Sequence, residues 1–459
     1  MAYGYKEKSF LALSPSVLFV SSVFFTAPIG KALLPGLPGE SLRFFFLILP
    51  FSFFYFLRYK STLPIFVVWL AYVINALASI VLHLDDLPPG LSINTFPVVR
   101  LAVHSLIVAF FLFAAWHALS KGTEQVWRWV RLSFQGFLFV SVLGAILYFG
   151  VRFAGLPRAQ YEMFNVMTQE GYGFLRFSPG SYPNEFGTMA SFFSVAALAL
   201  ILRRDTNIGK KLLWSVFVLG FIGMALATTR AAYITFALGV IIAFVSLDAG
   251  RALKGAFGAA VLSVIVIMLL PDSLVSSSLN VLQTGYSAAV NGTASVADRY
   301  EKWDTGIAYL ESSPLLGIGF EFPGAWGLHN TYLQFLVGLG GFGFGVAVLI
   351  FLWASVLFRR RFLQFADRNV IDSNLLVVTV IAGMHASLFA ASNHNQNHFL
   401  TWFALFLFWA TGSLLLRRRP ILARGAYRQR ARRAASQGEG PELNPSAIKN
   451  GGASSHAIG

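Results

Sequence analysis

The sequence predicts an all-α protein that crosses a membrane many times. Of its 459 residues, 56% are hydrophobic and only 12% are charged, about half the charged fraction of an ordinary soluble domain. The mean hydropathy is +0.65. The apolar residues also form runs of about 20, the length that a helix needs to cross a bilayer. A lipid bilayer is therefore the expected solvent and partner of this chain.

We predict about twelve spanning helices by this criterion. The expected spans are 10–29, 41–57, 63–82, 98–118, 126–150, 186–202, 212–227, 231–247, 253–270, 331–357, 375–391 and 399–416. Only a brief polar break, Thr228-Thr229-Arg230, separates the seventh span from the eighth.

The positive charges predict how the spans are oriented. Lys and Arg gather in every second loop, so the positive-inside rule places both termini in the cytoplasm. The two long loops, 151–185 and 271–328, then fall on the outer side, as do Arg230 and His329. The polar residues able to do chemistry therefore collect on the side away from ATP and nucleotide sugars.

Charge and cysteine usage exclude several classes of protein. The net charge of +15 comes largely from arginines in loops and in the tail 417–459, so we expect no nucleic-acid partner. The tail is basic and then rich in Gly, Ser and Pro, which predicts contact with anionic headgroups followed by disorder. The chain has no Cys, which excludes disulfides, thiol catalysis and thiolate metal sites.

The outer loop 271–328 is predicted to contain a helix of its own. Ser295 and Asp298 resemble a capping box at its start, and Pro314 stops it. An apolar face then follows helical spacing, and we expect it to lie at the membrane interface with Trp303 toward lipid. This face consists of Tyr300, Trp303, Ile307 and Leu310. Arg299, in the first turn, is an ion-pair partner of Glu301 or Asp298, a solvated residue, or a substrate contact.

Arg230 stands between two apolar runs on the outer side, where positive charge is disfavoured. An arginine at this depth needs an anion or another polar partner. Its planar fork of donors suits a diphosphate. The alternative is an arginine that extends to the lipid headgroups.

His329 ends a loop rich in Gly and Pro and precedes a span with Gly338, Gly340 and Gly341. Glycines there allow a ligand or another helix to approach closely. Histidine titrates near neutral pH, so His329 could take a proton from a hydroxyl nucleophile. The neighbouring Asn330 is a candidate glycan contact.

Two further outer-side segments carry candidate glycan or acceptor contacts. Arg176, Tyr182 and Asn184 precede a span, where a turn with a helix cap is the equal alternative. His394 and His398 have the i, i+4 spacing of a metal pair, but only amides lie between them. We therefore favour a polar lining over a metal site.

Four ordered segments resemble the O-antigen ligase and Wzy-type polysaccharide polymerase superfamily of bacterial inner membranes. They are Arg176 with Pro183-Asn184; Thr229-Arg230-Ala231-Ala232; Asp298-Arg299-Tyr300 with Trp303 and then Ser313-Pro314-Leu315-Leu316-Gly317-Ile318-Gly319; and His329-Asn330 with Leu333 and Gly340. The resemblance covers about residues 176–345, whereas the first six spans match only as generic membrane helices.

The resemblance implies a GT-C-like glycosyltransferase on the periplasmic face of the inner membrane. Its donor would be a glycan on undecaprenyl diphosphate, and its acceptor a hydroxyl of another glycan or of the lipid A core. Arg230 and Arg299 would hold the diphosphate, and His329 would act as general base. No metal or cofactor is implied, because the arginines do the electrostatic work of a cation.

On this basis we divide the chain into N-terminal transmembrane helices 1–175, a catalytic membrane domain 176–416 that includes the loop 271–328, and the tail 417–459. Ligase and polymerase activities both remain open, because they need the same diphosphate clamp. A polytopic transporter or flippase of a polar or lipid-linked substrate is the alternative from another class. Few acidic residues in the spans, and polar groups away from the midplane, favour transfer chemistry.

Overall fold

The computed structural model describes residues 63–87, 89–91, 96–157, 176–179, 183–205, 207–247, 294–322, 327–365, 372–392 and 399–411. This part of the chain is helical and contains no strand. Its helices are α4 (Leu63–Val81), η2 (Leu84–Asp86), α5 (Pro97–Lys121), α6 (Thr123–Phe153), α8 (Pro183–Leu202), α9 (Lys210–Ala227), α10 (Arg230–Val245), α13 (Ala294–Ser312), α15 (Thr331–Phe365), α16 (Ser373–Ser392) and α17 (Phe399–Thr411).

Nine predicted spans correspond to described helices, and the helix predicted within the outer loop is α13. Among the described residues, seven helices are long and apolar enough to cross a membrane, while α10 and α17 are apolar but shorter. The all-α polytopic membrane fold is therefore confirmed. The predicted spans 10–29, 41–57 and 253–270, and the tail, lie outside the described residues. The total of twelve spans and the GT-C-like architecture stay predictions.

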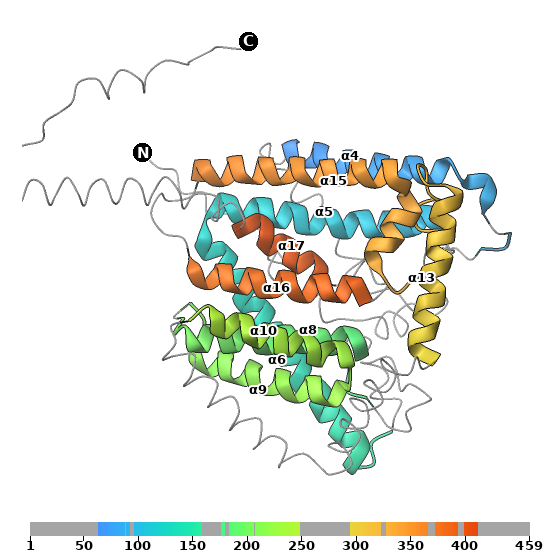
Figure 1. The fold of residues 1–459 in the computed structure, drawn as a ribbon. Helices are drawn as coiled ribbons and strands as arrows, with labels where there is room; N and C mark the ends of the chain where they lie inside the picture. The colour runs from blue at the N-terminus through green and yellow to red at the C-terminus, as the bar shows by residue number, and fades with distance from the viewer. Residues whose placement is uncertain are drawn as a thin grey trace, which may run out of the picture. The chain divides into compact units, whose positions relative to one another are not determined.

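Met1–Gly412 form one compact unit and Ser413–Gly459 a second, which lies wholly outside the described residues. Within the first unit, α4 pairs with α15, and α5 contacts both of them and α17. Helix α16 contacts α17 on one side and α8 and α10 on the other, and α9 packs on α8 and α6. Figure 1 shows the same order of neighbours from α4 to α9.

Small residues allow α8 to sit at the centre of its neighbours. The backbones of α8 and α9 approach closely at Gly220, where an added Cβ would lie 3.0 Å from Ala190 O and from Ser194 Cβ. The Ser194 hydroxyl donates to Phe217 O at 2.9 Å. Small side chains and interhelical hydrogen bonds are what hold helices together in lipid, where burial of apolar surface brings little gain.

A buried histidine joins three of these helices. His385 Nδ1 lies 2.9 Å from Ile381 O and donates to it, so Nε2 accepts from the Ser191 hydroxyl at 2.8 Å. Ser191 also contacts Thr235 Oγ1 at 3.2 Å. This network connects α8, α10 and α16 and gives His385 a structural role.

A polar cluster around Arg203 fixes one end of the helices. Arg203 donates to Asn374 Oδ1 at 2.7 Å, to Ser246 O at 2.9 Å and to Ser373 Oγ at 2.8 Å. The Trp127 indole donates to Asp372 nearby. We call this the Arg203 end: α8 and α10 finish here, and α6 and α16 begin here.

The opposite end follows from the direction of the chain. Because α5 finishes at Lys121 and α6 begins at Thr123, α5 also finishes at the Arg203 end. Helices α5, α8 and α10 therefore all begin at the other end. Arg100, in the first turn of α5, donates to Glu321 at 2.8 Å, which places the start of α15 there as well. Figure 1 shows α13 standing across this end, which we call the α13 end.

Helix α15 is broken near its start. Gly340 has φ 66° and ψ 175°, outside the helical range. The segment 314–320 lies alongside the break: Ile318 N donates to Val337 O at 3.0 Å, and Gly341 N donates to Pro314 O at 2.8 Å. Neighbours thus satisfy the backbone groups that the break releases, which is the condition for an irregular helix at membrane depth.

Gly340→Ala is expected to destabilise the protein. The left-handed extended backbone there is essentially confined to glycine and costs other residues about 1–3 kcal/mol, and an added Cβ would overlap Gly317 N and Leu315 O. Thermal unfolding in detergent should show a clearly lower midpoint. Gly345→Ala is the control, because an added Cβ there meets nothing within 4 Å. Equal midpoints for the two variants would contradict this account of the break.

Candidate active site

The α13 end brings together the starts of the helices that carry the predicted site residues. Arg230 is the first residue of α10, and His329 lies two residues before α15. Arg299 lies on α13, which packs against α15. Of the four non-glycine residues with positive φ in the described ranges, three lie at this end: Thr228 (51°), Glu321 (61°) and His329 (48°). Strained backbone of this kind concentrates at functional sites.

His329 is held in a defined turn. Its φ of 48° is left-handed, and Leu328 before it is buried. After it, Asn330 caps α15: the Asn330 side-chain oxygen accepts from Leu333 N at 3.1 Å, and its carbonyl accepts from Gln334 N at 3.0 Å. His329 is half-buried at the helix start. The Asn330 oxygen is thus used by the cap, which leaves its amide NH₂ for the predicted glycan contact.

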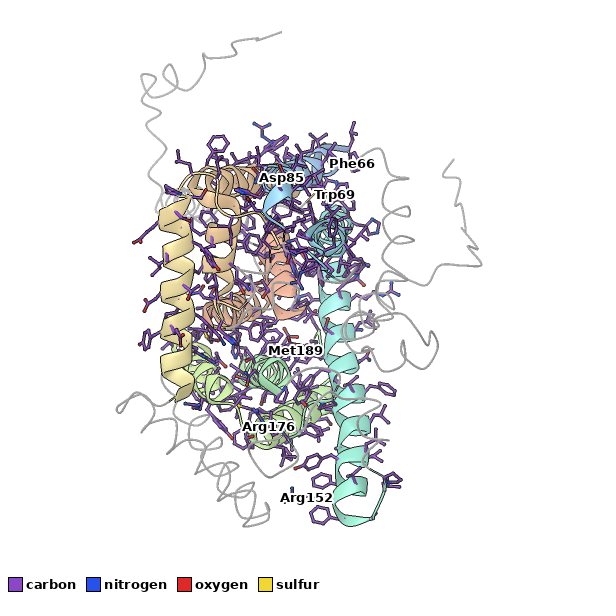
Figure 2. The ribbon with its side chains drawn as sticks, turned by 90° about the vertical axis from the view of Figure 1, so that its right-hand side faces the viewer. Phe66, Trp69, Asp85, Arg152, Arg176 and Met189 are labelled. Atoms are coloured by element: carbon purple, nitrogen blue, oxygen red, sulfur yellow. The ribbon has the colours of Figure 1, made fainter. Side chains whose placement is uncertain are left out.

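Arg230 is carried by a tight turn that Arg176 supports. The turn passes through Thr228 in the left-handed conformation. Arg176 is buried, and it donates to Ala227 O at 2.9 Å and to Thr228 O at 3.2 Å. Figure 2 shows it among the green helices α8–α10. An arginine at these last carbonyls of α9 is favourably placed. These bonds give Arg176 a structural role, the alternative that the sequence left open.

The inward face of α13 differs from the predicted one. Gly306 is buried, and a Cβ there would come within 3.0 Å of Leu328 and 3.1 Å of Leu333. Trp303 and Leu310 are half-buried, whereas Tyr300 is 58% and Ile307 is 46% exposed. The expectation that Trp303 points to lipid is wrong. Because Gly306 has no side chain, α13 packs closely on α15 at this residue. The face of α13 that points inward therefore consists of Arg299, Trp303, Gly306 and Leu310.

A buried ion pair ties the loop before His329 to α5. Arg100 Nε donates to Glu321 Oε2 at 2.8 Å; the Glu321 side chain is fully covered and that of Arg100 is 32% exposed. One residue earlier, Phe320 N donates to the Ser79 hydroxyl at 3.1 Å, and that hydroxyl donates to Gly338 O at 2.9 Å. Sequence reasoning missed this pair. A signal existed, because Arg100 is a positive charge at an outer helix start, like Arg230.

An apolar groove of about 530 Å³ leads away from the His329 turn. Helices α4, α5, α15, α16 and α17 line it, and on α15 its lining runs from Thr331 to Ala354. This stretch crosses the Gly340 break, so only Phe344–Ala354, about 15 Å at 1.5 Å per residue, belongs to one unbroken helical segment of the lining. Trp69, labelled in Figure 2, and Trp402 are among its aromatic walls. One end of the groove thus lies beside the histidine turn.

The remaining site predictions fare differently. Asn184 is the second residue of α8 and is exposed at the α13 end, where a substrate can reach it. Tyr182, His394 and His398 lie outside the described residues. The structure therefore brings the Arg299 helix into contact with the start of the His329 helix, and places Arg230 and Asn184 at the same end on other helices.

Residues 215–348 match the family model described as O-Antigen ligase. The matched segment contains Arg230, Arg299 and His329, and it ends beyond the Gly340 break. No curated protein matches the chain.

Arg100→Ala is expected to destabilise the protein by about 3 kcal/mol, because it leaves the Glu321 carboxylate buried without its ion pair. Adding Glu321→Gln should recover part of this loss, since a neutral amide costs less to bury than a charge. Thermal unfolding of the single and double variants measures this coupling. Additive effects of the two changes would show that the pair contributes no interaction energy.

Proposed function

We propose that this protein transfers a glycan from undecaprenyl diphosphate to an acceptor hydroxyl at the periplasmic face of the bacterial inner membrane. The premise is the match of residues 215–348 to the O-antigen ligase family model. The single observation that carries the proposal is the common α13 end: His329 lies just before α15, Arg230 is the first residue of α10, and Arg299 lies on α13.

The proposed reaction is a displacement at the anomeric carbon of the donor glycan. The acceptor hydroxyl oxygen attacks this carbon, and the bond from the carbon to the diphosphate oxygen breaks. His329 takes the hydroxyl proton as general base. Undecaprenyl diphosphate leaves with the bonding electron pair, and Arg230 and Arg299 stabilise the charge that develops on it.

The position of Arg230 supports an anion at this place. A helix N-terminus carries partial positive charge, so an arginine as first residue of α10 is electrostatically unfavourable by itself. An anion at the N-terminus relieves this by pairing with both the guanidinium and the first backbone N–H groups of the helix. The N-cap residue Thr229 makes no side-chain cap bond. A diphosphate suits such a site.

The groove supports a long-chain lipid as the other half of the donor. Its lining is almost wholly apolar, it includes both segments of α15, and it starts beside His329. A polyprenyl chain in the groove would leave its diphosphate at the α13 end. The arrangement thereby matches a lipid-linked diphosphate better than a free nucleotide sugar, which has no such chain.

His329→Ala and Arg230→Ala are each expected to reduce transfer by at least a hundredfold while the protein is made and inserted normally, because a base contributes about 10²–10⁴ and an oxyanion-type contact about 10²–10³. Purified protein with polyprenyl-diphosphate glycan and acceptor gives the measurement. His117→Ala and Arg128→Ala, toward the Arg203 end, are the matched controls and should retain activity. Normal transfer by either site variant would refute its assigned role.

Gel analysis of surface glycans in a deletion strain identifies the acceptor. Loss of all ligated glycan, with lipid-linked polymer accumulating, indicates a ligase. Single-repeat glycans on the lipid A core indicate a polymerase. Unchanged surface glycans would contradict the proposal.

Gly383→Leu is expected to raise the KM for a full-length polyprenyl donor about tenfold or more. Gly383 lines the groove on α16, and an added Cβ there meets nothing within 4 Å, so the leucine projects into the groove without disturbing its neighbours. Gly345→Leu is the matched control, since Gly345 also has open space but is not part of the lining. A donor with a very short prenyl chain should be used equally by both variants. Equal KM values of the two variants for the long donor would show that the groove does not bind the donor.

A further inference from the structure

Trp303 presents an unmatched hydrogen-bond donor at the α13 end. Its indole nitrogen is buried, and it has no hydrogen-bond partner among the residues that the structure describes. An N–H left unpaired away from water costs about 1–3 kcal/mol. The ring itself is well held, because it meets Tyr300 edge-on with 5.6 Å between centroids. The packing therefore fixes the indole while leaving its N–H without a partner.

The position of Trp303 on α13 shows where this N–H belongs. Arg299, Trp303 and Gly306 are spaced i, i+4 and i+7, which places them on one helix face. Gly306 packs on Leu328, the residue directly before His329. Trp303 is about 4.5 Å along the helix axis from Gly306, and Arg299 is one turn further. Along the helix, Trp303 therefore stands between Gly306, which packs beside the histidine turn, and Arg299.

The surroundings argue against lipid as the natural acceptor. Tyr300 and Ile307 occupy the outward face of α13, with 58% and 46% of their surfaces exposed. Trp303 lies only about 40–60° around the helix from them, on the side nearer Gly306 and α15. A headgroup would meet the outward residues first. An acceptor that reaches Trp303 must enter the space between α13 and the start of α15.

We propose that Trp303 is a donor-binding residue whose indole N–H donates a hydrogen bond to a phosphoryl oxygen of the lipid-linked glycosyl diphosphate. This inference rests on the proposed function. Arg299 on the same face supplies charge to the diphosphate, while Trp303 supplies a single, rigidly held neutral donor. The indole N–H can only donate, and its ring is held in place. It therefore favours a phosphoryl oxygen at one position, whatever the charge of the group.

The test is Trp303→Phe, which keeps an aromatic ring and removes the N–H. The KM for the polyprenyl-diphosphate glycan should rise about tenfold, as expected for one lost hydrogen bond to a charged group. The thermal midpoint of the substrate-free protein should fall only as far as the smaller ring costs in packing, because no hydrogen bond is lost there. Trp214→Phe is the control: Trp214 is 48% exposed on α9, and this change should alter neither quantity.

The outcomes separate the inference from its premise. If the wild-type protein transfers glycan and Trp303→Phe has an unchanged donor KM, the inference is wrong and the proposed function stands. If the wild-type protein transfers no glycan, the proposed function itself fails. A headgroup acceptor is distinguished by reconstitution: if Trp303→Phe changes activity only in phosphatidylglycerol vesicles and not in phosphatidylcholine, the partner is lipid and the inference is overturned.

Discussion

The pairing of the segment 314–320 with the opened turn of α15 is the contact on which the arrangement of the candidate site depends. In a bilayer every backbone polar group needs a partner inside the protein, so the break at Gly340 is possible only where another backbone lies against it. That backbone reaches the break directly from α13 and runs on toward His329. The same contact therefore fixes the helix with Arg299 and the loop with the histidine.

The two ends of the helices have different physical characters. At the Arg203 end, three donors of one guanidinium meet three acceptors from α10 and α16. At the α13 end lie strained residues, an arginine at a helix N-terminus and the unmatched donors Thr229 Oγ1 and Trp303 Nε1. Strain and unmatched donors cost stability and persist where the surrounding structure holds them. Well-paired contacts at the Arg203 end thus contrast with strained backbone and unmatched donors at the α13 end, where the proposed site lies.

Much of this organisation depends on local patterns and could be predicted from the sequence. The length of the apolar runs predicted nine of the described helices, and Pro314 predicted the end of α13. The unusual placement of its charge made Arg230 a candidate site residue. The glycines after His329 correctly predicted a close approach, but its partner is the segment 314–320 rather than a ligand or helix. The inward face of α13 could not be predicted, because periodicity marks an apolar stripe without showing that Gly306 sets the contact.

Contacts between residues far apart in the sequence also could not be predicted. Arg100 and Glu321 are 221 positions apart, and no local pattern connects them. The role of Arg176 stayed open for the same reason, since the carbonyls that it binds belong to a turn 51 and 52 positions later. Such pairs become visible only when the fold brings the helix ends together.

The groove also bears on how substrate reaches the protein. The lipid chain of the proposed donor, filling this apolar groove, would arrive by lateral diffusion in two dimensions rather than from bulk water. Saturation then depends on the mole fraction of the donor in the membrane, not on its concentration in the surrounding volume. Diluting the membrane with inert phospholipid should thus slow loading even when the total donor is constant.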